Sequence, residues 1–174
     1  MANQDSAFGF VPTRHMSGNS PRTNKYTILS GLAENIFSGD VVMLYTDGTI
    51  QPSNGASEAD KTIGIFGGCS YTASDGSYIY NDIWPTGTVA TDIIAYVYDG
   101  PDIVFRAQSA GTPAQTNIGN CADVTVGTGS TVTGTSGSEI SGTMADAPEN
   151  SFGANAVMEV LLNEHILAHN SAGV

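Results

Sequence analysis

Two of the three histidines have the spacing of metal ligands. His165 and His169 are four residues apart, as two zinc ligands are on one face of a helix, and Glu164 precedes the first. The order His-Glu-x-x-His is missing, however, and the sequence offers no third cluster of ligands. In a strand, the two rings would share a face but stand far apart. We therefore expect no metal site.

Nucleophilic catalysis also lacks a sequence signature. The chain has no Gly-x-Ser-x-Gly motif, and no local Cys-His pattern surrounds Cys69 or Cys121. The 17 acidic residues allow many carboxylate pairs for glycoside hydrolysis, yet nothing singles one pair out. Asp47, Asp99 and Asp102 could offer oxygen ligands to calcium, but they lie in turn sequences outside any EF-hand loop. We expect no catalytic residues and no cofactor.

The two cysteines are too few to form a disulfide framework in a chain of 174 residues. Cys69 and Cys121 both have apolar or small neighbours, which favours buried free thiols over a bridge. The first residues lack the basic and apolar regions of a signal peptide, so we expect synthesis in a cytoplasm, where thiols stay reduced.

Composition excludes some partners. Charged residues make up 13% of the chain, about half the usual share, and the formal net charge is −12. Nucleic-acid binding needs clustered Lys and Arg, so we expect no nucleic-acid partner. No apolar run approaches the roughly 18 residues of a membrane span, so we expect no membrane partner either.

The elements that would carry any site are strands. The chain is organised around residues 35–51, where an apolar β-branched run is followed by Asp47-Gly48, a pair typical of hairpin turns. Asp75-Gly76 and Asp99-Gly100 repeat this pattern beside Tyr- and Ile-rich runs. The pattern predicts a mainly β fold, a small antiparallel barrel or sandwich, with a second hairpin around residues 99–102.

The remaining segments complete one domain over residues 24–174. Thr112-Pro113-Ala114-Gln115 resembles a capping box and allows at most one short helix. Residues 127–142 are rich in Gly, Thr and Ser and form either a linker or, as we favour, a surface hairpin or loop. Residues 157–162 read as a final strand, with helix as the alternative.

Residues 1–23 are predicted to be an extended N-terminal arm. Glycines and prolines interrupt any helical or strand period, and through residue 25 the net charge is +2, against −14 for the rest. Such an arm can lay apolar anchors into the grooves of a partner, or it can pack on its own oligomer. The candidate partner-binding residues are Phe8, Phe10, Arg14, Met16, Arg22 and Lys25.

Tyrosines are dense between residues 71 and 98. Tyrosines at alternating strand positions often pack across strands or in subunit interfaces, and they can also line carbohydrate sites. The candidates for a subunit interface are Tyr78, Tyr80, Trp84, Tyr96 and Tyr98.

Several stretches, spread in order over most of the chain, resemble the capsid decoration (cement) proteins of tailed bacteriophages, particularly those of cyanobacterial and marine phages. They include the stretches at 8–15, 35–41, 63–71 and 95–99, Trp84-Pro85, 123–129 and 153–165. The resemblance implies a mainly β, usually trimeric protein on the outer capsid surface. It further implies contact with the major capsid protein, and it carries no catalytic motif.

The resemblance therefore predicts a structural virion protein that stabilises the shell. The alternative is a receptor- or glycan-binding β-module of a phage tail or fibre. The two differ in what they bind, which is an expanded capsid for the first and a host surface sugar for the second.

Overall fold

The computed structural model describes residues 4–53, 62–141, 153–163 and 165–166. These residues form thirteen strands of 2 to 12 residues, paired with one another in antiparallel fashion, and one turn of 3₁₀ helix. The predicted mainly β fold with at most one short helix is confirmed. Within the described residues the sheets do not close into a barrel, and their arrangement is sandwich-like.

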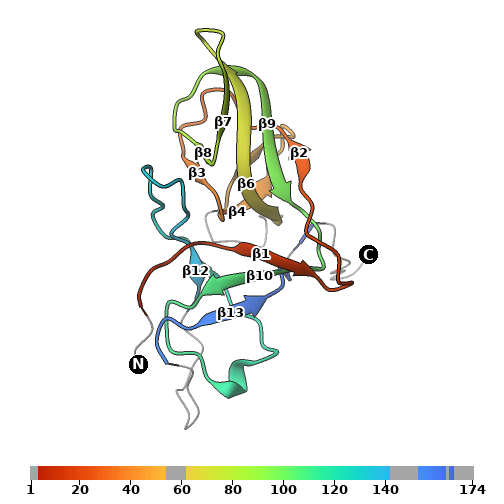
Figure 1. The fold of residues 1–174 in the computed structure, drawn as a ribbon, viewed down its shortest axis with the longest axis vertical. Helices are drawn as coiled ribbons and strands as arrows, with labels where there is room; N and C mark the ends of the chain where they lie inside the picture. The colour runs from red at the N-terminus through yellow and green to blue at the C-terminus, as the bar shows by residue number, and fades with distance from the viewer. Residues whose placement is uncertain (1–3, 54–61, 142–152, 164, 167–174) are drawn as a thin grey trace.

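The larger sheet has six strands in the order β2-β9-β6-β4-β5, with β7 paired to the other end of β6 (Figure 1). Its strands are β2 (Asn24–Tyr26), β4 (Val41–Leu44), β5 (Ile50–Pro52), β6 (Thr62–Ala73), β7 (Tyr78–Asn81) and β9 (Ala90–Tyr98).

β6 is the centre of this sheet. It pairs with β4 through its first residues, with β7 through its last residues and with β9 along most of its length. Ile65, Phe66 and Cys69 are fully buried, as suits a central strand with apolar residues on both faces. Gly64 lies against the backbone of Tyr98, where a Cβ atom would come within 2.2 Å of the carbonyl oxygen, so the pairing of β6 with β9 requires glycine there.

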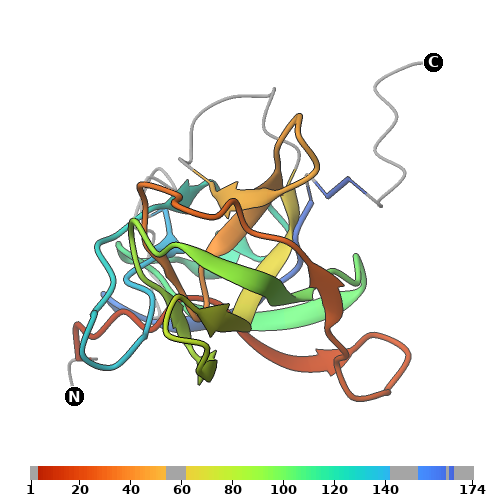
Figure 2. The ribbon, with the colours of Figure 1, turned by 90° about the horizontal axis from the view of Figure 1, so that it is seen from above.

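The smaller sheet has the order β1-β10-β13, and its strands run across the direction of β6 and β9 (Figures 1 and 2). It consists of β1 (Val11–His15), β10 (Ile103–Gln108) and β13 (Val157–Val160), which confirms strand over helix for the last segment. Phe10, Ile103 and Phe105 form its core together with Val41 and Ile65 of the larger sheet. The two sheets therefore share one packed junction.

Two of the three Asp-Gly pairs form the predicted hairpin turns, and the third does not. Asp47-Gly48 and Asp75-Gly76 each close a hairpin, β4–β5 and β6–β7, with φ of the two glycines at +83° and +84°. Asp99-Gly100 does not, so the predicted second hairpin is wrong. β9 pairs within the larger sheet and β10 within the smaller one, so residues 99–102 form the corner between the sheets.

The remaining elements are short and serve the connections. They are β3 (Ile36–Phe37), β8 (Ile83–Trp84), the 3₁₀ helix η1 (Gln115–Asn117), β11 (Val124–Thr125) and β12 (Glu139–Ile140). The helix begins two residues later than the sequence pattern indicated. Asn117 Oδ1 accepts a hydrogen bond from the Ala114 N–H at 2.7 Å, and Ala114, not Thr112, precedes the first turn.

The Gly-, Thr- and Ser-rich stretch, described here to residue 141, is tied to the body. β11 and β12 pair at its base, and Ser38 N and Ser136 N donate backbone hydrogen bonds that hold it beside β3. Gly127 and Gly137 approach so closely that a Cβ on Gly127 would come within 2.0 Å of the Gly137 oxygen. The loop therefore folds back on itself as a packed part of the domain.

The N-terminal segment differs from the predicted extended arm. β1 pairs with β10, and Phe10 is only 2% exposed in the junction core. The prediction failed because it considered only the segment's own glycines and prolines. Pro12 is tolerated because β1 is an edge strand, and a register shift follows it. At least residues 10–15 are thus an integral strand of the fold.

Candidate interaction surface

A row of tyrosines stands on the outer face of the larger sheet, and we call Tyr78, Tyr80 and Tyr96 the tyrosine row. Tyr78 and Tyr80 alternate along β7 and are 59% and 69% exposed, whereas Tyr96 on β9 is half-buried. Hairpin pairing sets Tyr80 opposite Ser70 and Tyr78 opposite Thr72. The inner residues between them, including Tyr71 and Ala95, pack into the core, so the alternation of the strands produces this face.

Ring contacts and hydroxyl bonds fix the tyrosine row. The Tyr80 and Tyr96 rings stack with centroids 5.5 Å apart, and Tyr78 meets Tyr80 edge to face at 6.3 Å. The Tyr80 hydroxyl donates to the Tyr96 oxygen at 2.5 Å, and the Ser70 and Tyr96 hydroxyls are 3.1 Å apart. The side chains therefore form one preorganised surface, which costs less ordering entropy on binding than separate flexible side chains would.

The hydroxyl bonds also separate the acidities of the two phenols. The hydrogen bond to Tyr96 raises the pKa of Tyr80 to about 12, because ionisation would remove the proton that it donates. Hydrogen bonds from Ser70 and Tyr80 lower the pKa of Tyr96, since they stabilise its phenolate. The raised pKa keeps Tyr80 protonated near neutral pH, which suits its role as the donor to the Tyr96 oxygen.

Charged groups of opposite sign flank the tyrosine row. Lys25 on β2 pairs in register with Tyr96, and its charge contributes to the lowered pKa of that phenol. Asp92, four residues before Tyr96 on β9, accepts a hydrogen bond from the Thr72 hydroxyl at 3.1 Å. The face therefore has a cationic end and an anionic end on either side of an aromatic centre.

The ring geometry does not suit sugar stacking. An aromatic sugar site presents an open ring face, whereas one face of Tyr80 is covered by Tyr96 and Tyr78 lies against it as well. Exposed, amphipathic rings at this density are typical of protein interfaces.

Two of the other aromatic candidates belong elsewhere. Trp84 is fully buried and packs edge to face on Tyr71 at 5.2 Å, so its assignment to a subunit interface is wrong. The pairing of β7 with β6 ends at Asn81, and β8, which contains Trp84, pairs with β3 inside the core. Tyr98 is half-buried and packs on the junction core.

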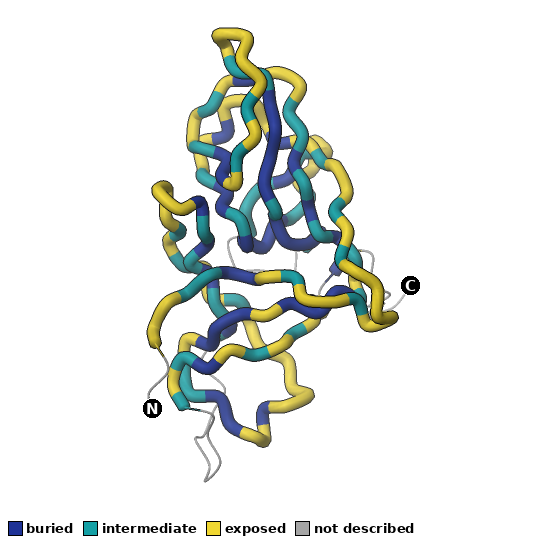
Figure 3. The backbone as a smooth tube through the Cα atoms, viewed as in Figure 1, coloured by how far each residue is buried: buried dark blue, intermediate teal, exposed yellow. Residues whose placement is uncertain are grey.

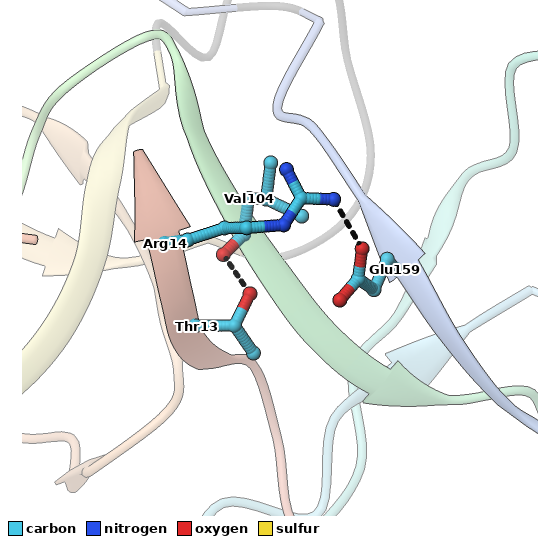
Figure 4. Close-up of polar contacts among 4 residues, drawn as sticks. All are labelled: Thr13, Arg14, Val104 and Glu159. Atoms are coloured by element: carbon cyan, nitrogen blue, oxygen red, sulfur yellow. Dashed lines mark hydrogen bonds and ion pairs between the residues drawn. The ribbon is translucent and has the colours of Figure 1, made fainter. Parts of the chain in front are cut away.

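The six N-terminal candidates divide into two groups. Phe10 is buried, Phe8 is half-buried with the Arg106 guanidinium 5.7 Å over its ring, and Arg14 forms a 2.6 Å ion pair with Glu159 of β13 (Figure 4). These three residues have partners within the chain, so Phe10 in particular cannot be an anchor for another protein. Thr13, beside Arg14, donates to the Val104 oxygen at 2.9 Å and further ties β1 to β10.

The other three candidates are exposed. Met16, Arg22 and Lys25 lie in and after the β1–β2 loop, which projects from the body in Figure 2 and is exposed along most of its length in Figure 3. His15 Nδ1 lies 2.6 Å from Asp102 Oδ2, and the Met16 N–H donates to the backbone carbonyl oxygen of Asp102 at 2.9 Å. The loop therefore projects from a firmly held base.

A buried polar cluster around Asp40 is structural. The Asp40 carboxylate, in a residue 7% exposed, accepts hydrogen bonds from Phe37 N–H at 2.8 Å, Ser136 Oγ at 2.5 Å and Ser138 Oγ at 3.4 Å. Burial raises its pKa in spite of these bonds. Asp40 also lines a cleft of about 430 Å³ with Glu34 on its rim. Because its oxygens hold the 127–141 loop against β3, we assign Asp40 to folding and not to acid–base chemistry.

A second buried carboxylate fixes the corner between the sheets. Asp99 accepts hydrogen bonds from the Tyr26 hydroxyl at 2.6 Å and from Asn24 Nδ2 at 2.9 Å. Burial and this bond raise the pKa of Tyr26, whereas burial lowers the pKa of the nearby His165. His165 thus lies in the fold's interior. His169 and Glu164, the other members of the suspected ligand set, lie outside the described residues.

Metal binding and membrane insertion find no support in the described part of the chain. It contains no group of three or more His, Cys, Asp or Glu side chains placed to hold a metal ion. None of its helical segments has the length and apolar character that crossing a bilayer requires. Both cysteines are free, as expected, although Cys121 is exposed and only Cys69 is buried.

Comparison of the chain with protein-family models, with curated proteins and with solved structures gives no match. The fold and the tyrosine row alone define the class of this chain, which is a mainly β protein with a preformed aromatic face. The resemblance to decoration proteins stays a prediction from the sequence.

Proposed function

We propose that this chain is a structural virion protein that binds the outer surface of a mature phage capsid and stabilises the shell, without catalysis. The observation that carries the proposal is the gathering of exposed side chains suited to protein contacts on a rigid sheet. The tyrosine row is one such surface, and the β1–β2 loop with Met16 and Arg22 is another. A protein that links neighbouring subunits of a shell needs at least two surfaces of this kind.

The β1–β2 loop is our candidate for the contact with the major capsid protein. Of the four basic residues in the described part, Arg14 is paired with Glu159 and Arg106 covers Phe8, while Arg22 and Lys25 are exposed. On a chain with net charge −12, these two cations favour docking on an acidic area of the shell. The exposed Met16 side chain adds an adaptable apolar contact.

The mechanism is linkage. A protein that binds only the expanded lattice stabilises that lattice by RT ln(1 + [L]/Kd) per site, which is about 2.7 kcal/mol at a hundredfold excess over Kd. Rigid β-sheet suits this role, because little conformational entropy is lost when a preformed surface binds. As in the proteins that the sequence resembles, we propose a homotrimer on the virion surface.

Co-sedimentation with purified empty phage shells tests the proposal. We expect binding to expanded shells and none to unexpanded ones, with an affinity that falls when salt is raised. Arg22→Gln should weaken binding, whereas Arg106→Gln, which removes the same charge elsewhere, should not. Binding to an array of host surface glycans but not to any shell would contradict the proposal and favour the receptor-binding alternative.

A further inference from the structure

We propose that the tyrosine row is a self-association surface, on which a second copy of this chain docks about a two-fold axis. The positions of the charged residues on this face indicate that its partner is a second copy of the chain. Lys25 lies at one end and Asp92 at the other, with Tyr80 and Tyr96 between them. A surface that carries opposite charges at its two ends is complementary to a copy of itself.

The register of the strands gives the geometry of the pairing. Lys25 is level with Tyr96 on β9, and Asp92 lies four residues away on the same strand. The separation along the strand is less than about 13 Å, the value for a regular strand at about 3.3 Å per residue, because the register shifts beside Asp92. A two-fold axis that runs across the strands midway between these levels sets Lys25 of one copy opposite Asp92 of the other. By symmetry the contact occurs twice, on either side of the axis.

The aromatic centre suits the same arrangement. Tyr80 is 69% exposed and Tyr78 is 59% exposed, so the rings of one copy have free surface on which the rings of the other can pack. Aromatic residues at the middle of an interface carry most of the affinity, and a charged rim around them sets orientation. β7, β6, β9 and β2 lie side by side in Figure 1.

This inference does not depend on the proposed function. A two-fold contact is isologous and cannot by itself close a threefold ring. On a shell it would join protomers of neighbouring trimers, and in solution it would pair free copies. Capsid binding and self-pairing therefore fail or succeed separately.

Charge complementation between two variants tests the pairing. Lys25→Asp gives a face with two anionic ends, and Asp92→Lys gives a face with two cationic ends. Each variant alone should self-associate roughly tenfold more weakly than the natural chain in analytical ultracentrifugation. An equimolar mixture of the two should recover the natural affinity, because both symmetry-related contacts are then between opposite charges.

The controls isolate the face. Arg22→Asp makes the same charge change as Lys25→Asp outside the tyrosine row, and it should leave self-association unchanged. Replacing Asp92 can strain the backbone, because its φ is +50°. Tyr80→Ser leaves Asp92 in place and should still abolish self-association. The inference is overturned if the mixture associates no better than each variant alone, if Tyr80→Ser pairs like the natural chain, or if the natural chain stays monomeric up to about 1 mM.

Discussion

Replacing Asp40 with alanine is expected to destabilise the protein by roughly 3 kcal/mol. The change leaves the Phe37 N–H and the hydroxyls of Ser136 and Ser138 without their acceptor. A buried donor without a partner costs about 1–3 kcal/mol. We assign the low end of this range, about 1 kcal/mol, to each of the three donors, which gives roughly 3 kcal/mol in total. The low end applies because serine hydroxyls can rotate to other acceptors and because removing a buried charge offsets part of the loss.

Urea unfolding at neutral pH measures this loss. Asp47→Ala is the matched control, since Asp47 also accepts two hydrogen bonds, from the N–H and the hydroxyl of Thr49, but does so in an exposed turn. Solvent can replace those bonds, so its loss should be much smaller. If the two variants lose the same stability, Asp40 does not hold the 127–141 loop against β3 and the reasoning is refuted.

The pH dependence of the same site has a definite sign. Burial raises the pKa of Asp40, so the folded protein binds its proton more tightly than the unfolded chain does. Its contribution is fully present below the ordinary carboxyl pKa and is lost as the pH rises through the raised pKa of the folded state. Subtracting the profile of Asp40→Asn, which does not titrate, from that of the natural chain isolates this term. A difference that rises with pH would contradict the assignment.

Three further outcomes are expected. A thiol reagent should label Cys121 at once in the folded protein and Cys69 only after unfolding, because Cys69 is buried and its pKa is raised to about 12. Rapid labelling of both thiols in the folded protein would contradict the burial of Cys69. The raised pKa of Tyr26 makes the folded natural chain less stable as the pH rises above 10, and Tyr26→Phe, which cannot ionise there, should lose less stability over this range. Melting temperatures of the two proteins that fall equally with pH would refute this. Phe10→Ala should cost about 3–5 kcal/mol in urea unfolding, whereas Met16→Ala should leave stability nearly unchanged; equal costs would mean that Phe10 is not core.

Local patterns in the sequence predicted part of the larger sheet. The apolar, β-branched run in residues 35–51 together with Asp47-Gly48 predicted a hairpin, and β4 and β5 form it. Gly48 and Gly76 adopt the positive φ that the Asp-Gly pairs indicated. The exposed tyrosines of β7 followed from period-two alternation. These features depend on near neighbours in the chain, which a single sequence contains.

Features that depend on distant partners were missed. Asp99-Gly100 has the composition of a hairpin turn, but the contacts of β10 with β1 and β13 turn it into a corner between two sheets. Phe10 belongs to a segment without a period of its own, and it is ordered by a core built from β4, β6 and β10. The serines that bind Asp40 lie 96 and 98 residues away, and no local pattern signals them.

The thermal stability of the shell itself tests the central claim most directly. Empty expanded shells are heated with and without saturating protein, and the disassembly temperature is recorded by scanning calorimetry. We expect the protein to raise this temperature in proportion to the logarithm of its concentration above Kd, and we expect Arg22→Gln to shift the response to higher concentrations. A disassembly temperature that does not change at any concentration would contradict it.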